Sequence, residues 1–197
     1  MIMPDPTINK NNPDVMRYDY HIIKQRGVFM FFKQIFSFFL FLMIFLAVSI
    51  DSYGKITWNI YSNARFGYDI EYPDILVPQE EAPNGDGRQF VSSDEKSVLI
   101  VYGAVDVLDT SVERMYTSAI DEYKKGGKKI LYRVIDKNWF VLSGYDGDKV
   151  FYRKTMRQHQ LEDDIDIDIT FIMTYPKSQK STFDKITEKI SGSFCFK

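Results

Sequence analysis

A run of seventeen residues without a formal charge, residues 34–50, most constrains how this chain can fold. A bilayer-spanning helix needs about 20 mostly apolar residues, and the apolar part of a signal peptide needs roughly 7–15, so the run falls between the two. Phe and Ile would occupy every face of a helix here, which leaves no polar stripe to turn toward water. We therefore expect the run to direct export and the residues after it to form the folded part of the protein.

The charges on either side of the run predict its orientation in a membrane. Four basic residues lie between positions 17 and 33, just before the run, and one acidic residue follows it at once, namely Arg17, Lys24, Arg26, Lys33 and Asp51. Cytoplasmic flanks carry an excess of Lys and Arg. The N-terminus is therefore expected to stay in the cytoplasm, while the rest of the chain crosses the inner membrane.

Two interpretations of this segment stay open: a cleaved signal peptide over residues 30–52, and an uncleaved anchor over residues 28–50. Met30 begins a short basic stretch, an apolar stretch and a small-residue end, in the order that signal peptides have. Small residues precede a candidate cleavage point after Ser49, and a second candidate follows Gly54.

Residues 1–29 are predicted to be either disordered or an over-extended reading frame. They contain Pro4, Pro6 and Pro13 and show no hydrophobic periodicity, which is typical of disorder. If translation starts at Met30, they are not part of the natural protein. No cysteine ends the apolar run, which argues against a bacterial lipoprotein anchor.

Residues 55–197 are predicted to form a single α+β domain. Removing residues 1–49 from the 197 leaves 148 residues, a common size for one domain. The totals of 25 Lys/Arg and 27 Asp/Glu lose five and three, so 20 basic and 24 acidic residues remain, a net charge of −4. This balance argues against a nucleic-acid partner and against recruitment to anionic lipid by charge.

The counts of cysteine and histidine narrow both the compartment and the chemistry. Cys195 is the only cysteine, so the domain has no internal disulfide although it is expected to be exported. This favours a bacterial periplasm or surface over a eukaryotic secretory route, where small domains carry disulfides. His159 is the only histidine after residue 49, so Cys/His zinc sites are excluded and a catalytic triad has a single imidazole to use.

Hydrophobic patterns predict an antiparallel sheet of about seven or eight strands covered by two helices. One helix follows Thr110 or Ser111 as its N-cap, and a final helix is capped by Ser181. Residues 74–88, rich in Pro, Glu and Gly, are expected to form a long surface loop. Strands are expected at residues 56–61, 66–72, 89–92, 97–102, 129–136, 138–143, 149–155 and 161–175.

The run Phe66-Gly-Tyr-Asp-Ile-Glu-Tyr-Pro73 and the later pair Tyr175-Pro176 before the last helix resemble the Mog1/PsbP-like family. The resemblance implies an α/β/α sandwich over roughly residues 58–196. One departure is Asp74-Ile75-Leu76, where the family often has a tryptophan. Members range from a Ran-binding nuclear transport factor to photosystem subunits and bacterial envelope proteins, so the resemblance implies a fold and no single function.

Two groups of carboxylates are candidates for cation binding. Asn84, Asp86, Asp146 and Asp148 lie at expected loop tips and carry the oxygen ligands that calcium uses. The motif around Asn84 lacks the rest of an EF-hand, so a tight turn is the favoured interpretation. Asp164, Asp166 and Asp168 alternate along one face of the last strand. They lie about 6.6–6.8 Å apart in succession, which favours a charged solvent face over a shared ion.

A hydrolase is the weakest alternative. Ser143 and His159 are the candidate pair, but no Gly-x-Ser-x-Gly elbow surrounds the serine. Cys195 is expected to pack in the core with Phe194 and Phe196. Most tyrosines fall at expected core positions, so the patterns predict no aromatic ligand groove.

We therefore assign no catalytic, cofactor-binding or metal-binding residue from the sequence. The favoured function is an exported, non-enzymatic envelope protein that acts as a binding or assembly module. Its expected partner is another envelope protein, and its expected location is periplasmic, cell-surface, secreted or membrane-anchored. Calcium-dependent binding and hydrolysis are the alternatives. We expect the surface site at residues 74–88, because long loops in compact domains are disproportionately functional.

Overall fold

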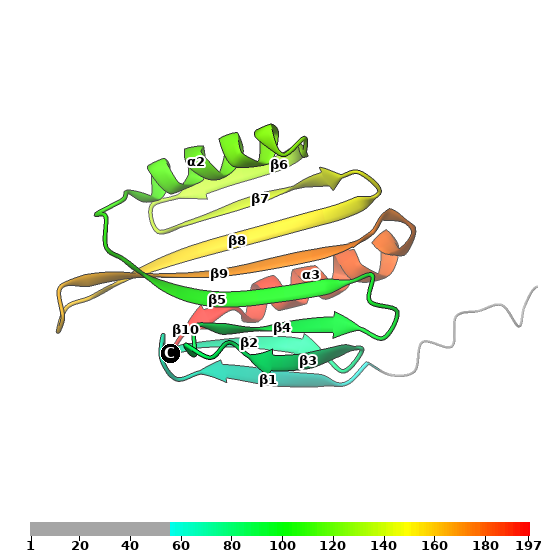
Figure 1. The fold of residues 1–197 in the computed structure, drawn as a ribbon, viewed down its shortest axis with the longest axis horizontal. Coiled ribbons are helices and arrows are strands. Elements are labelled where there is room, and N and C mark those ends of the chain that lie inside the picture. The colour runs from blue at the N-terminus through cyan, green and yellow to red at the C-terminus, as the bar shows by residue number, and fades with distance from the viewer. Residues whose placement is uncertain (1–55) are drawn as a thin grey trace, which may run out of the picture. The chain divides into compact units, whose positions relative to one another are not determined.

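The computed structural model describes residues 56–197 (Figure 1). The predicted export segment and the Met30 start lie outside the described residues. The elements in chain order are β1 (Trp58–Asn63), β2 (Tyr68–Pro73), β3 (Leu76–Glu81), β4 (Gly87–Ser92), β5 (Val98–Asp106), α2 (Val112–Lys125), β6 (Lys129–Asp136), β7 (Trp139–Asp146), β8 (Lys149–Gln160), β9 (Ile165–Pro176), a 3-10 turn (Lys177–Gln179), α3 (Lys180–Ser193) and β10 (Cys195–Phe196).

A seven-stranded antiparallel sheet forms the centre of the fold, in the order β3-β4-β5-β9-β8-β7-β6 (Figure 1). The two longest strands, β8 and β9, pair over their whole length, from Lys149 opposite Pro176 to Gln160 opposite Ile165. The strict alternation of apolar and polar residues in β9 explains its central place, because every second side chain from Ile167 to Tyr175 is buried on one face.

The larger core lies on that face, beneath α3 and a second sheet of three strands ordered β1-β2-β10. Phe183, Ile186 and Ile190 of α3 pack against the apolar side of β9. Tyr68 and Ile70 of β2 bury their side chains completely in the same core. The three-stranded sheet is a feature that the hydrophobic patterns did not predict.

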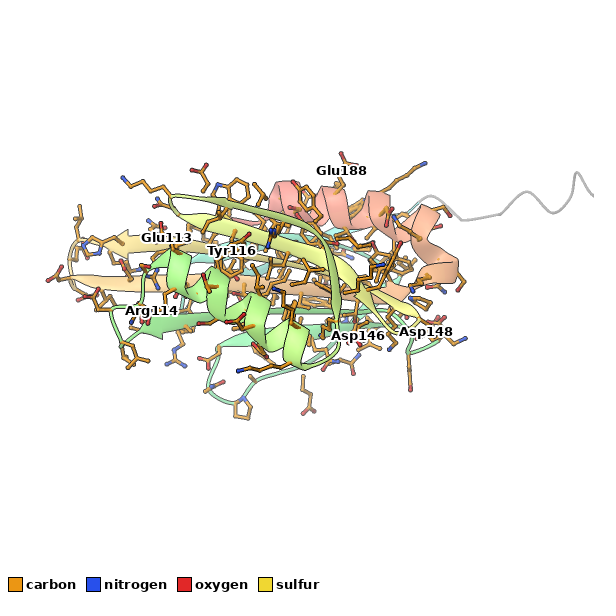
Figure 2. All side chains as sticks on the ribbon, turned by 90° about the horizontal axis from the view of Figure 1, so that it is seen from above. Glu113, Arg114, Tyr116, Asp146, Asp148 and Glu188 are labelled. Atoms are coloured by element: carbon orange, nitrogen blue, oxygen red, sulfur yellow. The ribbon has the colours of Figure 1, made fainter. Side chains whose placement is uncertain are left out.

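The smaller core lies on the opposite face of the large sheet, where α2 covers β6, β7 and β8. From α2 this core contains Val112, Ala119, Ile120 and Tyr123. From the sheet it contains Phe140, Leu142 and Phe151. Figure 2 shows the two helices on opposite sides of the sheet, with Glu113 and Tyr116 on α2 and Glu188 on α3. The prediction of an antiparallel sheet between two helices is confirmed.

Residues 74–88 differ from the expected long loop, because most of them form β3 and its turn into β4. Leu76 is the only buried residue of β3, and the five residues after it are exposed. Alternation of apolar and polar residues is the signal by which a strand is predicted from sequence. A strand that buries a single side chain does not show it.

Two further expectations about the C-terminal segment are wrong. The helix starts two residues earlier than a Ser181 cap implies, at Lys180, and no side chain caps it, so Ser181 lies inside its first turn. Cys195 is exposed rather than packed in the core, because it belongs to β10 and lies opposite Asp69 of β2. Neighbouring residues of an extended chain point to opposite faces. Of Phe194, Cys195 and Phe196, only Phe194 is buried.

Within residues 56–197, neither α2 nor α3 meets the length and hydropathy needed to cross a bilayer.

Candidate functional site

The candidate calcium ligands are engaged with other partners or stand apart. Asp86 forms an ion pair with Arg65, whose Nη1 lies 2.6 Å from its carboxylate, and it also accepts a hydrogen bond from the Asn84 amide. Asp146 lies 3.4 Å from Lys128 Nζ. Among residues 56–197, no three His, Cys, Asp or Glu side chains are grouped closely enough to hold a metal ion.

The row of aspartates on β9 surrounds Arg157 of β8. The guanidinium lies 2.7 Å from Asp168, 3.2 Å from Asp166 and 2.9 Å from Asp106 of β5. Arg157 is 10% exposed and Asp168 is 14% exposed, so this is a partly buried ionic cluster and not a solvated face. Asp164 lies in the turn before β9, with a positive φ of 51°, and its side chain is exposed.

The candidate hydrolase pair is separated by the sheet. Ser143 lies opposite Tyr152 on β8, and His159 lies seven residues farther along that strand, which corresponds to about 23 Å at the usual rise. An odd number of residues also turns the two side chains to opposite faces. The Ser143 hydroxyl donates to Phe151 O at 2.8 Å, and His159 contacts Asp166 at 2.9 Å. His159 is part of β8, which extends beyond the strand expected at residues 149–155.

The expected site beside residues 74–88 is a hollow of about 490 Å³ over β3, β4 and β5. Val77, Val91 and Val98 line it together with small polar side chains, and it includes no buried polar atom without a partner. A second hollow, lined by both a helix and the sheet, lies on the other side of the molecule.

That site is a groove of about 450 Å³ between α3 and the strands β6, β7, β8 and β9. We call it the tyrosine groove, because four tyrosines line its sheet wall and its helix wall is polar. Its main lining residues are Tyr132, Tyr145, Tyr152, Tyr175, Asp184, Thr187, Glu188 and Ser191.

The register of the strands produces the sheet wall of the groove. Tyr132 lies opposite Ser143, and Ser143 lies opposite Tyr152, so the three side chains follow one line across β6, β7 and β8. A β-bulge between Ile130 and Tyr132 turns Leu131 toward the groove as well.

Gly144 allows that bulge. A Cβ atom at this position would lie 1.9 Å from the carbonyl oxygen of Lys129, which is too close for any residue with a side chain. The glycine therefore lets the two backbones approach closely at the bulge.

The periodicity of α3 produces the helix wall. Asp184, Thr187, Glu188 and Ser191 recur at spacings of three and four residues, which places them on one stripe of the helix. The buried stripe of α3 lies beside it and fixes the orientation of the helix on the sheet.

Hydrogen bonds hold the inner tyrosines in place. The Tyr175 hydroxyl donates to Asp184 Oδ1 at 2.7 Å, and Asp184 also pairs with Lys180. The Tyr152 hydroxyl lies 2.9 Å from Ser191 Oγ, and either oxygen can donate. Burial raises the pKa of both tyrosines, and the hydrogen bond to Asp184 raises that of Tyr175 further, so both stay protonated at neutral pH.

A buried hydroxyl without a partner lies in the same wall. Thr187 is 3% exposed, and its Oγ1 atom completes no hydrogen bond with any described residue. A hydrogen-bonding contact with Thr187, outside the geometry of a completed bond, lowers the pKa of Tyr175 against the larger effect of burial. The Thr187 hydroxyl therefore lies beside the Tyr175 hydroxyl in this wall.

The outer rim of the groove is apolar and exposed. Leu131 is 55% exposed and Tyr132 is 57% exposed, both on β6. Glu188 forms the opposite rim and is also exposed. Tyr175 is in the core as the patterns predicted, but Tyr132 is at the surface. The patterns predicted no aromatic ligand groove, and the structure does place four tyrosines around one hollow, because strand register and the bulge decide which tyrosines meet.

The chemistry available in the groove suits binding. Tyrosine hydroxyls can donate or accept hydrogen bonds, ring faces can attract cations, and carboxylates can accept from ligand donors. Tyr145 already shows such a contact, because Lys177 Nζ lies 4.1 Å from its ring centre.

This protein is similar in structure to several solved proteins of low sequence identity. The cyanobacterial PsbP protein CyanoP of Synechocystis sp. PCC 6803 is 14% identical with a TM-score of 0.55, covering 76% of this chain and 98% of its own. LpqN of Mycobacterium tuberculosis, described as involved in cell envelope biogenesis, is 12% identical with a TM-score of 0.52, covering 72% and 91%. The protein has the Mog1/PsbP-like fold.

A third solved structure is similar at a lower TM-score. The Ran-binding protein Mog1p of Saccharomyces cerevisiae is 10% identical with a TM-score of 0.46, covering 72% of this chain and 96% of its own. No family model matches the sequence, and no curated protein matches it. The Mog1/PsbP-like fold predicted from residues 66–73 and the closing Tyr-Pro pair is confirmed, whereas identities this low carry no site from one protein to another.

Proposed function

We propose that this protein is an exported, non-enzymatic binding module of the cell envelope, and that the tyrosine groove is where its partner binds. The observation that carries the proposal is the combination of an exposed apolar rim with a groove that four tyrosines line opposite a polar helix wall. The apolar run at residues 34–50 and its basic N-terminal flank support export. LpqN, which shares the fold, is described as involved in cell envelope biogenesis, and this supports the same compartment.

The size of the groove favours a protein partner that inserts a few side chains. A volume of about 450 Å³ lies at the lower end of ligand pockets, and the exposed rim extends it along β6. Interfaces concentrate their binding energy in aromatic residues near a desolvated centre, and the four tyrosines supply this composition.

Site-specific photo-crosslinking in the native envelope tests the proposal. A photoreactive amino acid at position 188 is expected to give a defined protein adduct. The same amino acid at position 122, an exposed glutamate of α2, serves as the matched control. Adducts of equal yield at both positions, or none at position 188, would rule the groove out. Fractionation of the same cells tests export, and recovery of the chain in the cytoplasmic fraction would contradict it.

A further inference from the structure

β6 leaves one edge of the large sheet open beside the tyrosine groove. It is the last strand in the sheet order, so the N–H and C=O groups that point away from β7 have no strand partner among the described residues. From Tyr132 to Asp136 its pairing with β7 is regular. Such an edge is a template for another strand.

The opposite edge of the sheet is protected against strand addition. β3 contains Pro78, which cannot donate a backbone hydrogen bond, and its register breaks between Pro78 and Glu81. The open edge is therefore the one that adjoins the groove, and this coincidence of an edge and a groove is the basis of the inference.

The register of β6 determines where the side chains of an added strand would lie. Tyr132 faces the groove, because it lies opposite Ser143, whereas Ile135 faces α2, because it lies opposite Phe140. Tyr132 is 57% exposed and Ile135 is 36% exposed, so each face of β6 has apolar surface to cover. Every second side chain of an added strand would lie beside Tyr132 at the groove.

The charge at the groove selects the chemistry of those side chains. Asp184 is neutralised by Lys180, but Glu188 takes part in no ion pair with a described residue. Tyrosine ring faces next to a carboxylate attract a cation. A lysine or arginine in the added strand would complement both.

We propose that the partner docks by strand addition: an extended segment of another protein pairs with the free edge of β6 and places a basic side chain in the tyrosine groove. This deepens the proposed function and rests on it. Backbone hydrogen bonds to β6 give affinity that is independent of sequence, and the groove gives selectivity for the alternate basic residues.

Peptide binding to the natural protein, isolated from its own cells, tests the inference. The probe is a fluorescently labelled eight-residue peptide that alternates valine with lysine, measured by fluorescence anisotropy. Two further versions carry N-methyl groups on either the odd or the even backbone amides. We expect one version to bind about tenfold more weakly or worse and the other to bind nearly unchanged, because only every second amide of an edge strand faces its neighbour.

A charge exchange tests the groove contact. Glu188→Lys is expected to weaken the lysine peptide about threefold to fivefold and to strengthen a peptide that alternates valine with glutamate. Glu122→Lys on α2 makes the same change in net charge and is expected to leave both affinities unchanged. Equal effects of the two substitutions would overturn the charge selectivity.

The remaining outcomes separate the two proposals. If both N-methylated peptides bind alike, strand addition is wrong while the groove stays the binding site. Crosslinks at position 188 without any peptide binding would also exclude strand addition and leave the groove as the binding site. Failure of both experiments removes the proposed function itself. Sedimentation that shows a dimer broken by N-methylated copies of the β6 sequence would identify a second copy as the occupant and overturn the proposal of a different partner.

Discussion

At the scale of single residues, Arg157 has the strongest electrostatic environment in the described part of the chain. Its guanidinium is held among Asp106, Asp166 and Asp168 and also donates to Thr110 O. The hydrogen bond to Asp168 is the main cause that raises the pKa of Arg157 above its usual range. The cluster joins β5, β8 and β9 to the segment that leads into α2.

Replacing Arg157 is expected to destabilise the fold strongly. Arg157→Met keeps most of the volume but leaves three carboxylates together without a cation, which costs about 3–5 kcal/mol for a partly buried cluster at neutral pH. Urea denaturation followed by circular dichroism measures the loss. A loss below about 1 kcal/mol would show that the cluster behaves as an exposed ion pair.

The same cluster predicts how stability depends on pH. Burial alone would raise the pKa of Asp106, but the backbone N–H groups of Leu108 and Thr110 together with Arg157 lower it below the ordinary value of 3.8. The folded state therefore binds this proton less tightly than the unfolded state. The stabilisation is present above pH 3.8 and is lost as the pH falls through the lower folded pKa. Denaturation midpoints measured from pH 7 down to pH 2 are expected to fall mainly below pH 4 for the natural protein. In Arg157→Met the midpoint is expected to fall less, because Asp106 has then lost the cation that helps to lower its pKa.

Two glycines give a second matched prediction. Gly144→Ala is expected to destabilise the domain by about 1–3 kcal/mol, because the new methyl group would overlap Lys129 O at the bulge. Gly192→Ala is the control: it lies in α3 with no atom within 4 Å of the added Cβ, and it is expected to stabilise by about 0.5–1 kcal/mol. Thermal melts of both variants check the signs, and a neutral Gly144→Ala would contradict the close approach.

At the scale of elements, α2 and α3 begin in different ways although both follow serine-containing sequences. Ser111 caps α2, and its Oγ accepts from the backbone N–H of Arg114 at 3.3 Å. In α3 the 3-10 turn leads straight into the helix, so Ser181 caps nothing. Ser111→Ala is expected to cost about 1 kcal/mol, and Ser181→Ala is expected to change stability by less than about 0.5 kcal/mol. Equal losses in chemical denaturation would restore the cap predicted at Ser181.

β6 is the element whose role changes most between sequence and structure. Its pattern predicts a strand, and the structure confirms the predicted bounds, residues 129–136, but the pattern does not say that it lies at the end of the sheet. The end position leaves its edge open and brings Tyr132 next to the groove.

At the scale of the whole molecule, the proposed export would determine where the domain acts. We expect the natural protein, isolated from its own cells, to begin after Ser49 if the segment is a signal peptide, or at Met30 if it is an anchor. Intact mass and N-terminal sequencing distinguish the two. A product that retains residues 1–29 would contradict the Met30 start.

The sequence by itself determined the elements that repeat a clear hydrophobic period. The alternation from residue 165 to residue 175, the amphipathic α2 and the closing helix predicted the sheet and its two helices, because burial of one face leaves a direct trace in the order of residues. The motif at residues 66–73 and the pair Tyr175-Pro176 predicted the fold by their resemblance to the Mog1/PsbP-like family. The edge strand β3 left no such trace, since it buries only Leu76.

Only the tertiary structure decided what meets across the sheet. Arg157 meets three aspartates, and Ser143 is kept from His159, because strand register and side-chain alternation place residues far apart in the chain. The tyrosine groove depends on the same causes. These are the bulge in β6 opposite Gly144, the position of β6 at the edge of the sheet, and the orientation of α3, which its buried side fixes. A local period records which side chains are buried. It does not record which neighbours they find, because pairing between distant strands is set by the packing of the whole domain.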